Sequence, residues 1–191
     1  MEYYGKILLR DGRECCLRNG TEEDAKAVLD TFRLTHSETD YLLTYPDEIT
    51  YTEEQEREYL KKKTESANEI EIVAAVDGRI VGMAGIESVG TCEKIRHRAD
   101  LGISIEKEYW SLGIGRAMME ACIECARNAG YKQVELTAVG ENERALALYR
   151  REGFVEYGRN PKGFRSRLTG WQETVHMRLE LDETGKQVQE S

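Results

Sequence analysis

The feature that most constrains this chain is a glycine loop between a predicted strand and a predicted helix. The segment Leu101-Gly-Ile-Ser-Ile105 is followed, after a short linker, by Trp110-Ser-Leu-Gly-Ile-Gly-Arg-Ala117. Apolar side chains then recur at helical spacing over 113–129, so the loop should lie at a helix N-terminus. There, backbone N–H groups and the positive end of the helix dipole favour a phosphate or pyrophosphate ligand. The sequence therefore predicts an anion site at Gly113 and Gly115.

Two well-known phosphate-binding loops fit these residues poorly. A dinucleotide-binding fingerprint needs a third glycine and an early parallel unit, whereas the chain has Met118 there and antiparallel strand signals before it. A P-loop needs Lys and Ser or Thr after its last glycine, but the chain has Arg116 and Ala117. Because glycines also serve tight turns, a purely structural loop is a further alternative.

The rest of the chain predicts an α/β domain with a central mixed, mostly antiparallel sheet flanked by helices. Strands at Tyr3–Leu9 and Glu14–Arg18 flank an Asp11-Gly12 turn, and helices begin after Thr21 and Thr52. The later expected elements are strands at Ile70–Val76, Ile80–Ile86, Ala99–Ile105 and Gln133–Val139, helices at Gly113–Ala129 and from Asn142 to about Glu152, a strand beginning at Phe154–Tyr157, a loop around Pro161, Gly163 and Gly170, and a last strand from Val175 to Leu181.

Length and composition fit one folded domain. The chain has 191 residues, of which 40% are hydrophobic and 33% charged. We expect a single domain over residues 1–182 and a polar tail over 183–191. The apolar runs are far shorter than the roughly 20 residues that cross a bilayer, and no segment resembles a signal peptide.

Net charge limits the classes of binding partner, and the cysteines indicate the cellular compartment. The formal net charge of −9 argues against nucleic acid or an anionic membrane and favours a cationic small molecule or a protein amine. Five cysteines without a secretory signal predict reduced thiols in a cytoplasm. Cys122 and Cys125 have a redox-like spacing, but they fall inside a predicted helix and should pack in the core. His36, His97 and His176 are too scattered to predict a metal site.

A second block makes the glycine loop more specific. It reads Asn142-Glu-Arg-Ala-Leu-Ala-Leu-Tyr-Arg-Arg-Glu-Gly-Phe154. With the preceding strand, Gly-x-Gly loop and helix, this block resembles the GNAT superfamily of acyl-CoA-dependent N-acyltransferases. The resemblance covers about Ile70 to Leu181, and the two N-terminal helices more loosely. It implies that the protein transfers the acetyl group of acetyl-CoA to a primary amine of a polyamine, an amino acid or a protein N-terminus.

The resemblance also implies where the cofactor binds. The glycine loop would hold the CoA pyrophosphate, although Trp110 replaces the usual Gln or Arg and removes a side-chain phosphate contact. The strand before it resembles one whose edge a bulge leaves open, so that backbone groups near Ile103 and Ile105 bond the pantetheine amides and polarise the thioester. The expected cofactor-binding residues are Ile103, Ser104, Ile105, Leu112, Gly113, Ile114, Gly115, Arg116, Asn142 and Tyr149.

Tyr149 is the expected general acid for the departing thiolate. Its ordinary pKa of about 10 exceeds the roughly 8.5 of a thiol, so the hydroxyl stays protonated at neutral pH. A tyrosine that only packs its helix on the sheet is the alternative, but the neighbouring Asn142 and Gly153-Phe154 favour the acid role. Since no Cys or Ser lies beside an evident base, we expect direct transfer to the amine.

The sequence leaves the general base and the acceptor open. Glu87, Asp100 and His97 lie on or beside central strands, where each could take a proton directly or through water. Glu87 is favoured because it ends a core strand, although a solvated carboxylate there is common. The acceptor pocket would be built from Tyr41–Ile49, Glu87 and Gly158–Gly170.

Two rival functions use the same loop. One is a non-catalytic acyl-CoA-binding sensor or regulatory module, and the other is a nucleotide-binding protein. The presence of Tyr149 speaks against the first. A homodimer is a further option that the sequence does not decide.

Overall fold

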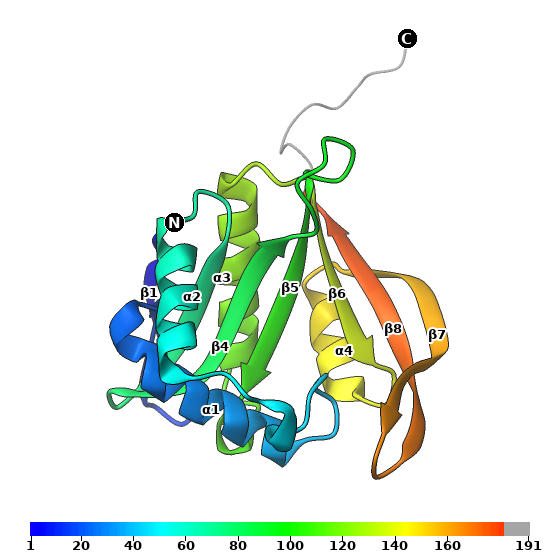
Figure 1. The fold of residues 1–191 in the computed structure, drawn as a ribbon, viewed down its shortest axis with the longest axis horizontal. Helices are drawn as coiled ribbons and strands as arrows, with labels where there is room; N and C mark the ends of the chain where they lie inside the picture. The colour runs from blue at the N-terminus through cyan, green and yellow to red at the C-terminus, as the bar shows by residue number, and fades with distance from the viewer. Residues whose placement is uncertain (182–191) are drawn as a thin grey trace.

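The computed structural model describes residues 1–181, which form one sheet of eight strands with helices on both faces (Figure 1). The tail expected over 183–191 lies outside the described residues. The strands are β1 (Tyr4–Leu8), β2 (Glu14–Asn19), β3 (Ile70–Val76), β4 (Arg79–Ser88), β5 (Arg98–Ile105), β6 (Gln133–Val139), β7 (Val155–Ser166) and β8 (Gly170–Glu180). The helices are α1 (Ala25–Glu38), α2 (Glu53–Glu65), α3 (Ile114–Asn128) and α4 (Glu143–Arg151).

The strand order is β1-β2-β3-β4-β5-β6-β8-β7, and every neighbouring pair is antiparallel except β5 with β6. Helices α1 and α2 cover the front of the sheet in Figure 1, while α3 and α4 lie behind it. The fold class predicted from the sequence is therefore confirmed. Within the described residues, no helix is long and apolar enough to span a membrane.

Helix starts follow from local capping, as the sequence predicted. The Thr52 hydroxyl accepts a hydrogen bond from the Gln55 backbone N–H at 3.2 Å, and the Gln55 side chain accepts one from the Thr52 N–H at 2.9 Å. The Asn142 side chain likewise accepts from the Ala145 N–H at 3.2 Å and begins α4. These caps satisfy N–H groups that the first turn of a helix leaves without partners.

The central strands β5 and β6 pair over only three residues each. Arg98–Asp100 runs parallel to Gln133–Glu135, and beyond Asp100 strand β5 has no pairing partner on that side. At the paired end, the Arg98 guanidinium donates two hydrogen bonds to the Glu135 carboxylate, one of them at 2.7 Å. The sheet is thus fastened at one end of these strands and open at the other.

The open edge arises differently from the sequence-based expectation. The pairing of β4 with β5 runs without a register shift from Gly82 with Ile105 to Ser88 with Ala99, so no bulge opens the edge of β5. Divergence of β5 from β6 opens it instead, because the two strands separate beyond their three paired residues (Figure 1).

The loop predicted around Pro161, Gly163 and Gly170 is wrong. Strand β7 continues through it to Ser166, and β7 and β8 form a long hairpin. Pro161 fits because β7 is the edge strand and its register shifts between Asn160 and Phe164, where a missing N–H breaks no regular ladder.

A group of acidic and aromatic side chains lies between α2 and the sheet, beside a cavity of about 510 Å³. The Tyr59 hydroxyl donates to Glu71 at 3.3 Å and to Glu87 at 3.1 Å, and the Lys63 ammonium lies 2.8 Å from Glu87. Burial raises the pKa of Glu71 to about 7, although Lys63 acts in the opposite direction. Glu71 therefore holds a proton in the native state that the unfolded chain releases near 4.5.

We expect Glu71→Gln to remove a pH dependence of stability. Because the native pKa of Glu71 lies above the unfolded value, native stability falls as pH rises from about 4.5 to 7. From pH 5 to pH 8 the wild-type free energy of unfolding should drop by about 1–3 kcal/mol more than that of the variant. Urea unfolding at both pH values measures this, with exposed Glu65→Gln at the end of α2 as control. Equal pH slopes for Glu71→Gln and wild type would contradict the assignment.

Candidate active site

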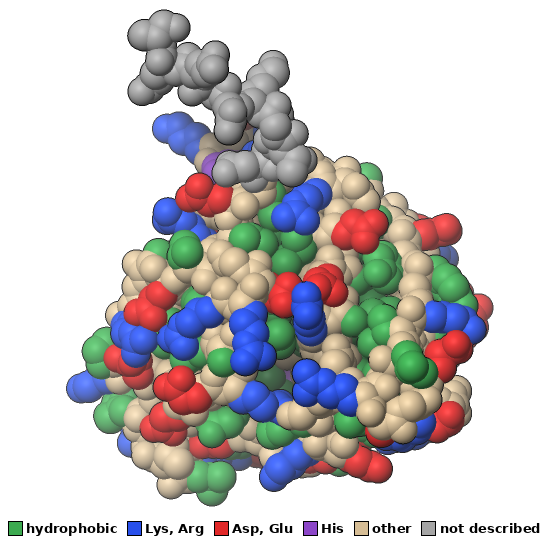
Figure 2. Space-filling model, turned by 180° about the vertical axis from the view of Figure 1, so that it is seen from behind, with side chains coloured by type: hydrophobic (Ala, Val, Ile, Leu, Met, Phe, Trp, Pro, Cys, Tyr) green, Lys and Arg blue, Asp and Glu red, His purple; other side chains and the backbone are tan. Residues whose placement is uncertain are grey.

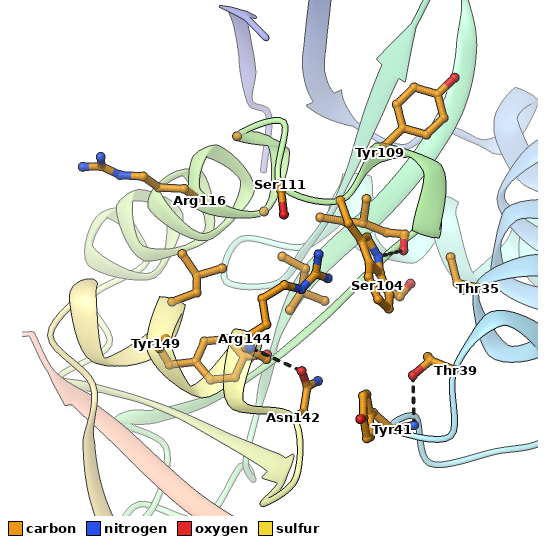
Figure 3. Close-up of a pocket in the computed structure, with 18 of the residues that line it drawn as sticks. Thr35, Thr39, Tyr41, Ser104, Tyr109, Ser111, Arg116, Asn142, Arg144 and Tyr149 are labelled. Atoms are coloured by element: carbon orange, nitrogen blue, oxygen red, sulfur yellow. Dashed lines mark hydrogen bonds between the residues drawn. The ribbon is translucent and has the colours of Figure 1, made fainter. Parts of the chain in front are cut away.

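A cleft of about 480 Å³ opens where β5 separates from β6. Figure 3 shows Ser104 on one side, Asn142, Arg144 and Tyr149 on the α4 side, and Arg116 beyond the glycine loop. Of the predicted cofactor-binding residues, the cleft is lined by Ile103, Ser104, Ile105, Gly113, Gly115, Arg116, Asn142 and Tyr149. Leu112 and Ile114 do not line it, because their side chains pack into the core.

The glycine loop forms the N-terminal end of α3. Gly113 caps the helix with φ of +107°, a left-handed conformation that disfavours a side chain. A Cβ at Gly115 would lie 3.3 Å from the Ile105 side chain and 3.4 Å from the Leu148 side chain. Both glycines thus keep the loop backbone open toward the cleft.

Arg10, from the start of the chain, holds the loop in place. Its backbone N–H donates to the Leu112 carbonyl at 3.2 Å, and its guanidinium donates to the Ser111 carbonyl at 3.1 Å. Both contacts use carbonyl groups of the loop and occupy none of its N–H groups. Sequence reasoning missed Arg10, since nothing near position 10 signals a contact about 100 residues away.

Strand β5 contributes an unpaired edge and an unpaired hydroxyl. The Ser104 Oγ atom is buried without a hydrogen-bond partner within the described part of the chain. Buried polar groups are nearly always paired, so this atom and the free edge of β5 are suited to a ligand that brings amide groups.

Tyr149 is buried in the wall that α4 provides, with its ring 6.2 Å from that of Phe154. Its side chain lines the cleft beside Asn142 (Figure 3). Burial raises the pKa of Tyr149 to about 12, and Arg144 opposes this shift. The hydroxyl is therefore a proton donor over the whole neutral range.

The cleft gathers positive charge in an acidic protein. The cleft is lined by Arg10, Arg116, Arg144 and Arg151, and Glu152 is the one carboxylate among the described residues that lines it, although the chain carries a net charge of −9. Figure 2 shows basic side chains around a hollow on the face opposite to that of Figure 1. This local excess of cations favours an anionic ligand.

The candidate bases lie apart from this cleft. Glu87 and Asp100 face each other across β4 and β5, and neither lines the cleft. The Glu87 side chain is 54% exposed and paired with Lys63. Burial, followed by Glu135 and Glu87, raises the pKa of Asp100 to about 6. His97 is exposed and precedes β5.

Of the segments expected to hold the acceptor, one lines the cleft and another does not. Tyr41 and Leu42, after α1, line the cleft together with Thr39. The hairpin of β7 and β8 does not line it but is tied to this segment, because the Ser166 hydroxyl donates to Asp40 at 2.6 Å.

Sequence reasoning also missed several side chains on α4. Ala145, Leu148 and Glu152, the residue that ends α4, line the cleft. Ala145 is three residues from Asn142 and Glu152 is three from Tyr149, a spacing that could have identified these two. Cys122 and Cys125, in contrast, are buried in the core as predicted.

Comparison with known proteins identifies the fold family. The profile of the "Acetyltransferase (GNAT) family" matches residues 32–154. The chain is 31% identical over 93 residues to the L-amino acid N-acetyltransferase AaaT of Escherichia coli, a match that covers 48% of the chain and 57% of that protein. It is 32% identical over 88 residues to the N-alpha-acetyltransferase RimI of Mycobacterium tuberculosis, covering 46% of the chain and 53% of that protein.

Agreement with a solved structure is more extensive. A GNAT-family acetyltransferase from Streptococcus pneumoniae superposes with a TM-score of 0.84 at 28% identity, over 87% of this chain and 99% of that one. The two curated relatives match over little more than half of their own lengths. The family profile covers most of the chain, including the glycine loop and the block that ends at Phe154. The chain therefore belongs to the acetyltransferase (GNAT) family.

Proposed function

We propose that this protein is an N-acetyltransferase that moves the acetyl group of acetyl-CoA directly to a primary amine. The observation that carries the proposal is the meeting, in one cleft, of the glycine loop, the unpaired edge of β5 and the buried Tyr149 hydroxyl. Family membership supports it, because the curated relatives are named as N-acetyltransferases.

The residues of the cleft fit a CoA molecule. A pyrophosphate suits the open N–H groups at Gly113 and Gly115 and the surrounding arginines. Pantetheine amides suit the free edge of β5 beyond Asp100, and the orphaned Ser104 hydroxyl offers a further polar contact. When bound, acetyl-CoA would supply an activated thioester.

Different residues of the chain would then polarise the thioester, protonate the leaving group and deprotonate the amine. Backbone N–H groups of β5 near Ile103 and Ile105 would polarise the carbonyl under attack. Tyr149, which burial keeps protonated, would donate its proton to the leaving sulfur as the carbon–sulfur bond breaks. Glu87 stays our candidate base, acting through water because its carboxylate is solvent-exposed, with Asp100 across the strand pair as the alternative.

The charge of nearby side chains and the names of the curated relatives both bear on the class of acceptor. Glu87 and Asp100 form an acidic surface on the face of β4 and β5, which favours a cationic amine. One curated relative is named an L-amino acid N-acetyltransferase and the other an N-alpha-acetyltransferase, so amino acids and protein N-termini are candidates beside polyamines. We place the protein in the cytoplasm because all five cysteines are free thiols.

The test is release of free CoA from acetyl-CoA with a panel of polyamines, amino acids and peptide N-termini. Thiol-reactive dye reports turnover, and mass spectrometry locates the acetyl group on the amine. We expect turnover on at least one class and none without an amine. Tight acetyl-CoA binding without turnover on the whole panel would favour a sensor module instead, and a preference for ATP or NAD in thermal shift would reject the CoA assignment.

Gly113→Val and Gly115→Val should each weaken acetyl-CoA binding at least tenfold. Valine at 113 strains a backbone with φ of +107°, and valine at 115 crowds Ile105 and Leu148 at the mouth of the loop. Calorimetry measures the affinity, and Gly130→Val, equally strained with φ of +84° just beyond the far end of α3, is the control. Arg116→Ala should cost less, because Arg116 is already paired with Glu120 and Glu152. Unchanged affinity in folded Gly113 and Gly115 variants would remove the loop from the cofactor site.

Tyr149→Phe should lower kcat by about a hundredfold or more while the acetyl-CoA affinity holds. Phenylalanine keeps the packing against Phe154 and removes only the proton donor. Because the pKa of Tyr149 is about 12, any alkaline limb of the rate below pH 10 belongs to another group and should persist in the variant. Steady-state kinetics test this, with exposed Tyr4→Phe as control. A kcat near wild type would assign Tyr149 to packing alone.

A further inference from the structure

Arg144 and Trp110 meet across the cleft from its two opposite walls. The guanidinium carbon of Arg144, in the first turn of α4, lies 3.7 Å from the centre of the Trp110 ring. The Trp110 indole N–H donates to the Ile105 carbonyl at 2.7 Å and pins the ring to the end of β5. The side chain of Arg144 therefore rests on a fixed aromatic ring in the lining of the cleft.

Arg144 carries a charge that the described residues do not balance. Arg116, in the same cleft, lies 3.0 Å from Glu120 and 3.3 Å from Glu152, whereas no described carboxylate forms an ion pair with Arg144. Desolvation in the cleft lowers the pKa of Arg144, although the residue as a whole is exposed. Its place in the first turn of α4 is also unfavourable for a cation, because the positive end of the helix dipole lies there.

Stacking leaves the hydrogen-bonding edge of the guanidinium available. A guanidinium stacks through its face, while its five N–H donors lie in its plane. Contact with Trp110 therefore orients Arg144 without using those donors. A phosphate between this edge and the α4 N-terminus would satisfy both.

We propose that Arg144, held in position by Trp110, binds a phosphate group of CoA, so that Arg144 is a cofactor-binding residue and Trp110 its positioning residue. The inference rests on the proposed function, since it assigns residues of the same cleft. It adds a side-chain contact from α4 to the backbone contacts expected from the glycine loop.

Calorimetry with acetyl-CoA tests the role of Arg144 without depending on turnover. We expect Arg144→Gln to weaken acetyl-CoA binding about tenfold or more, with a larger loss at low salt than at high salt. Arg150→Gln, on the same helix but outside the cleft lining, is the matched control and should bind within twofold of wild type.

A second ligand identifies which phosphate is bound. If Arg144 contacts the pyrophosphate, Arg144→Gln should weaken acetyl-dephospho-CoA as much as acetyl-CoA. If it contacts the 3′-phosphate, wild type should bind the dephospho analogue more weakly and the variant should lose nothing further. Either result supports a phosphate contact.

Trp110→Leu in two backgrounds tests the positioning role. We expect it to weaken acetyl-CoA binding a few-fold when Arg144 is present and to add nothing in Arg144→Gln, because its effect acts through the arginine. In Trp171→Phe, Trp110 is the sole tryptophan, and its emission should change on acetyl-CoA binding only when Arg144 is present.

Three results would overturn the inference. Arg144→Gln binding acetyl-CoA within twofold of wild type would remove Arg144 from the cofactor site. Equal losses from Trp110→Leu in both backgrounds would make Trp110 a direct contact and not a positioning residue. Failure of wild type to bind acetyl-CoA would overturn the proposed function as well, whereas the first two results leave that function standing.

Discussion

The short parallel contact between β5 and β6 is the constraint on which the site depends. Three residues of each strand pair, and the Arg98–Glu135 ion pair fastens them at that end. If the pairing continued along both strands, main-chain hydrogen bonds would fill the space that the cleft now occupies. The structure instead leaves part of β5 unpaired, and unpaired strand edges are ready to bind a ligand's amide groups.

Charge is distributed unevenly around this opening. The chain as a whole is acidic, yet arginines from the N-terminal segment, the glycine loop and α4 converge on the cleft. Glu87 and Asp100, which face each other across β4 and β5, lie outside that cleft. An anionic cofactor and a cationic acceptor would therefore be drawn to different places along these strands.

Burial shifts the pKa values of several titrating groups. The same desolvation keeps the Tyr149 hydroxyl protonated and brings the carboxyls of Asp100 and Glu71 toward neutral pH. A phenol that stays protonated is suited to donate a proton, and a carboxyl with a pKa near 6 is suited to accept one. These shifts depend on packing by α2, α4 and neighbouring strands, so no motif in the sequence records them.

The sequence by itself determined the elements whose signals lie within a few residues of one another. Caps at Thr52 and Asn142, the glycine loop and the Asn142 to Phe154 block are of this kind, because a turn, a cap or a helix face is decided by side chains up to four positions apart. Tertiary structure alone decided the divergence of β5 from β6, the support of the loop by Arg10 and the contact of Arg144 with Trp110. It also placed Glu87 outside the cleft and drew Pro161 into an edge strand. Those outcomes depend on the path of the whole chain, which brings together groups that no local spacing relates.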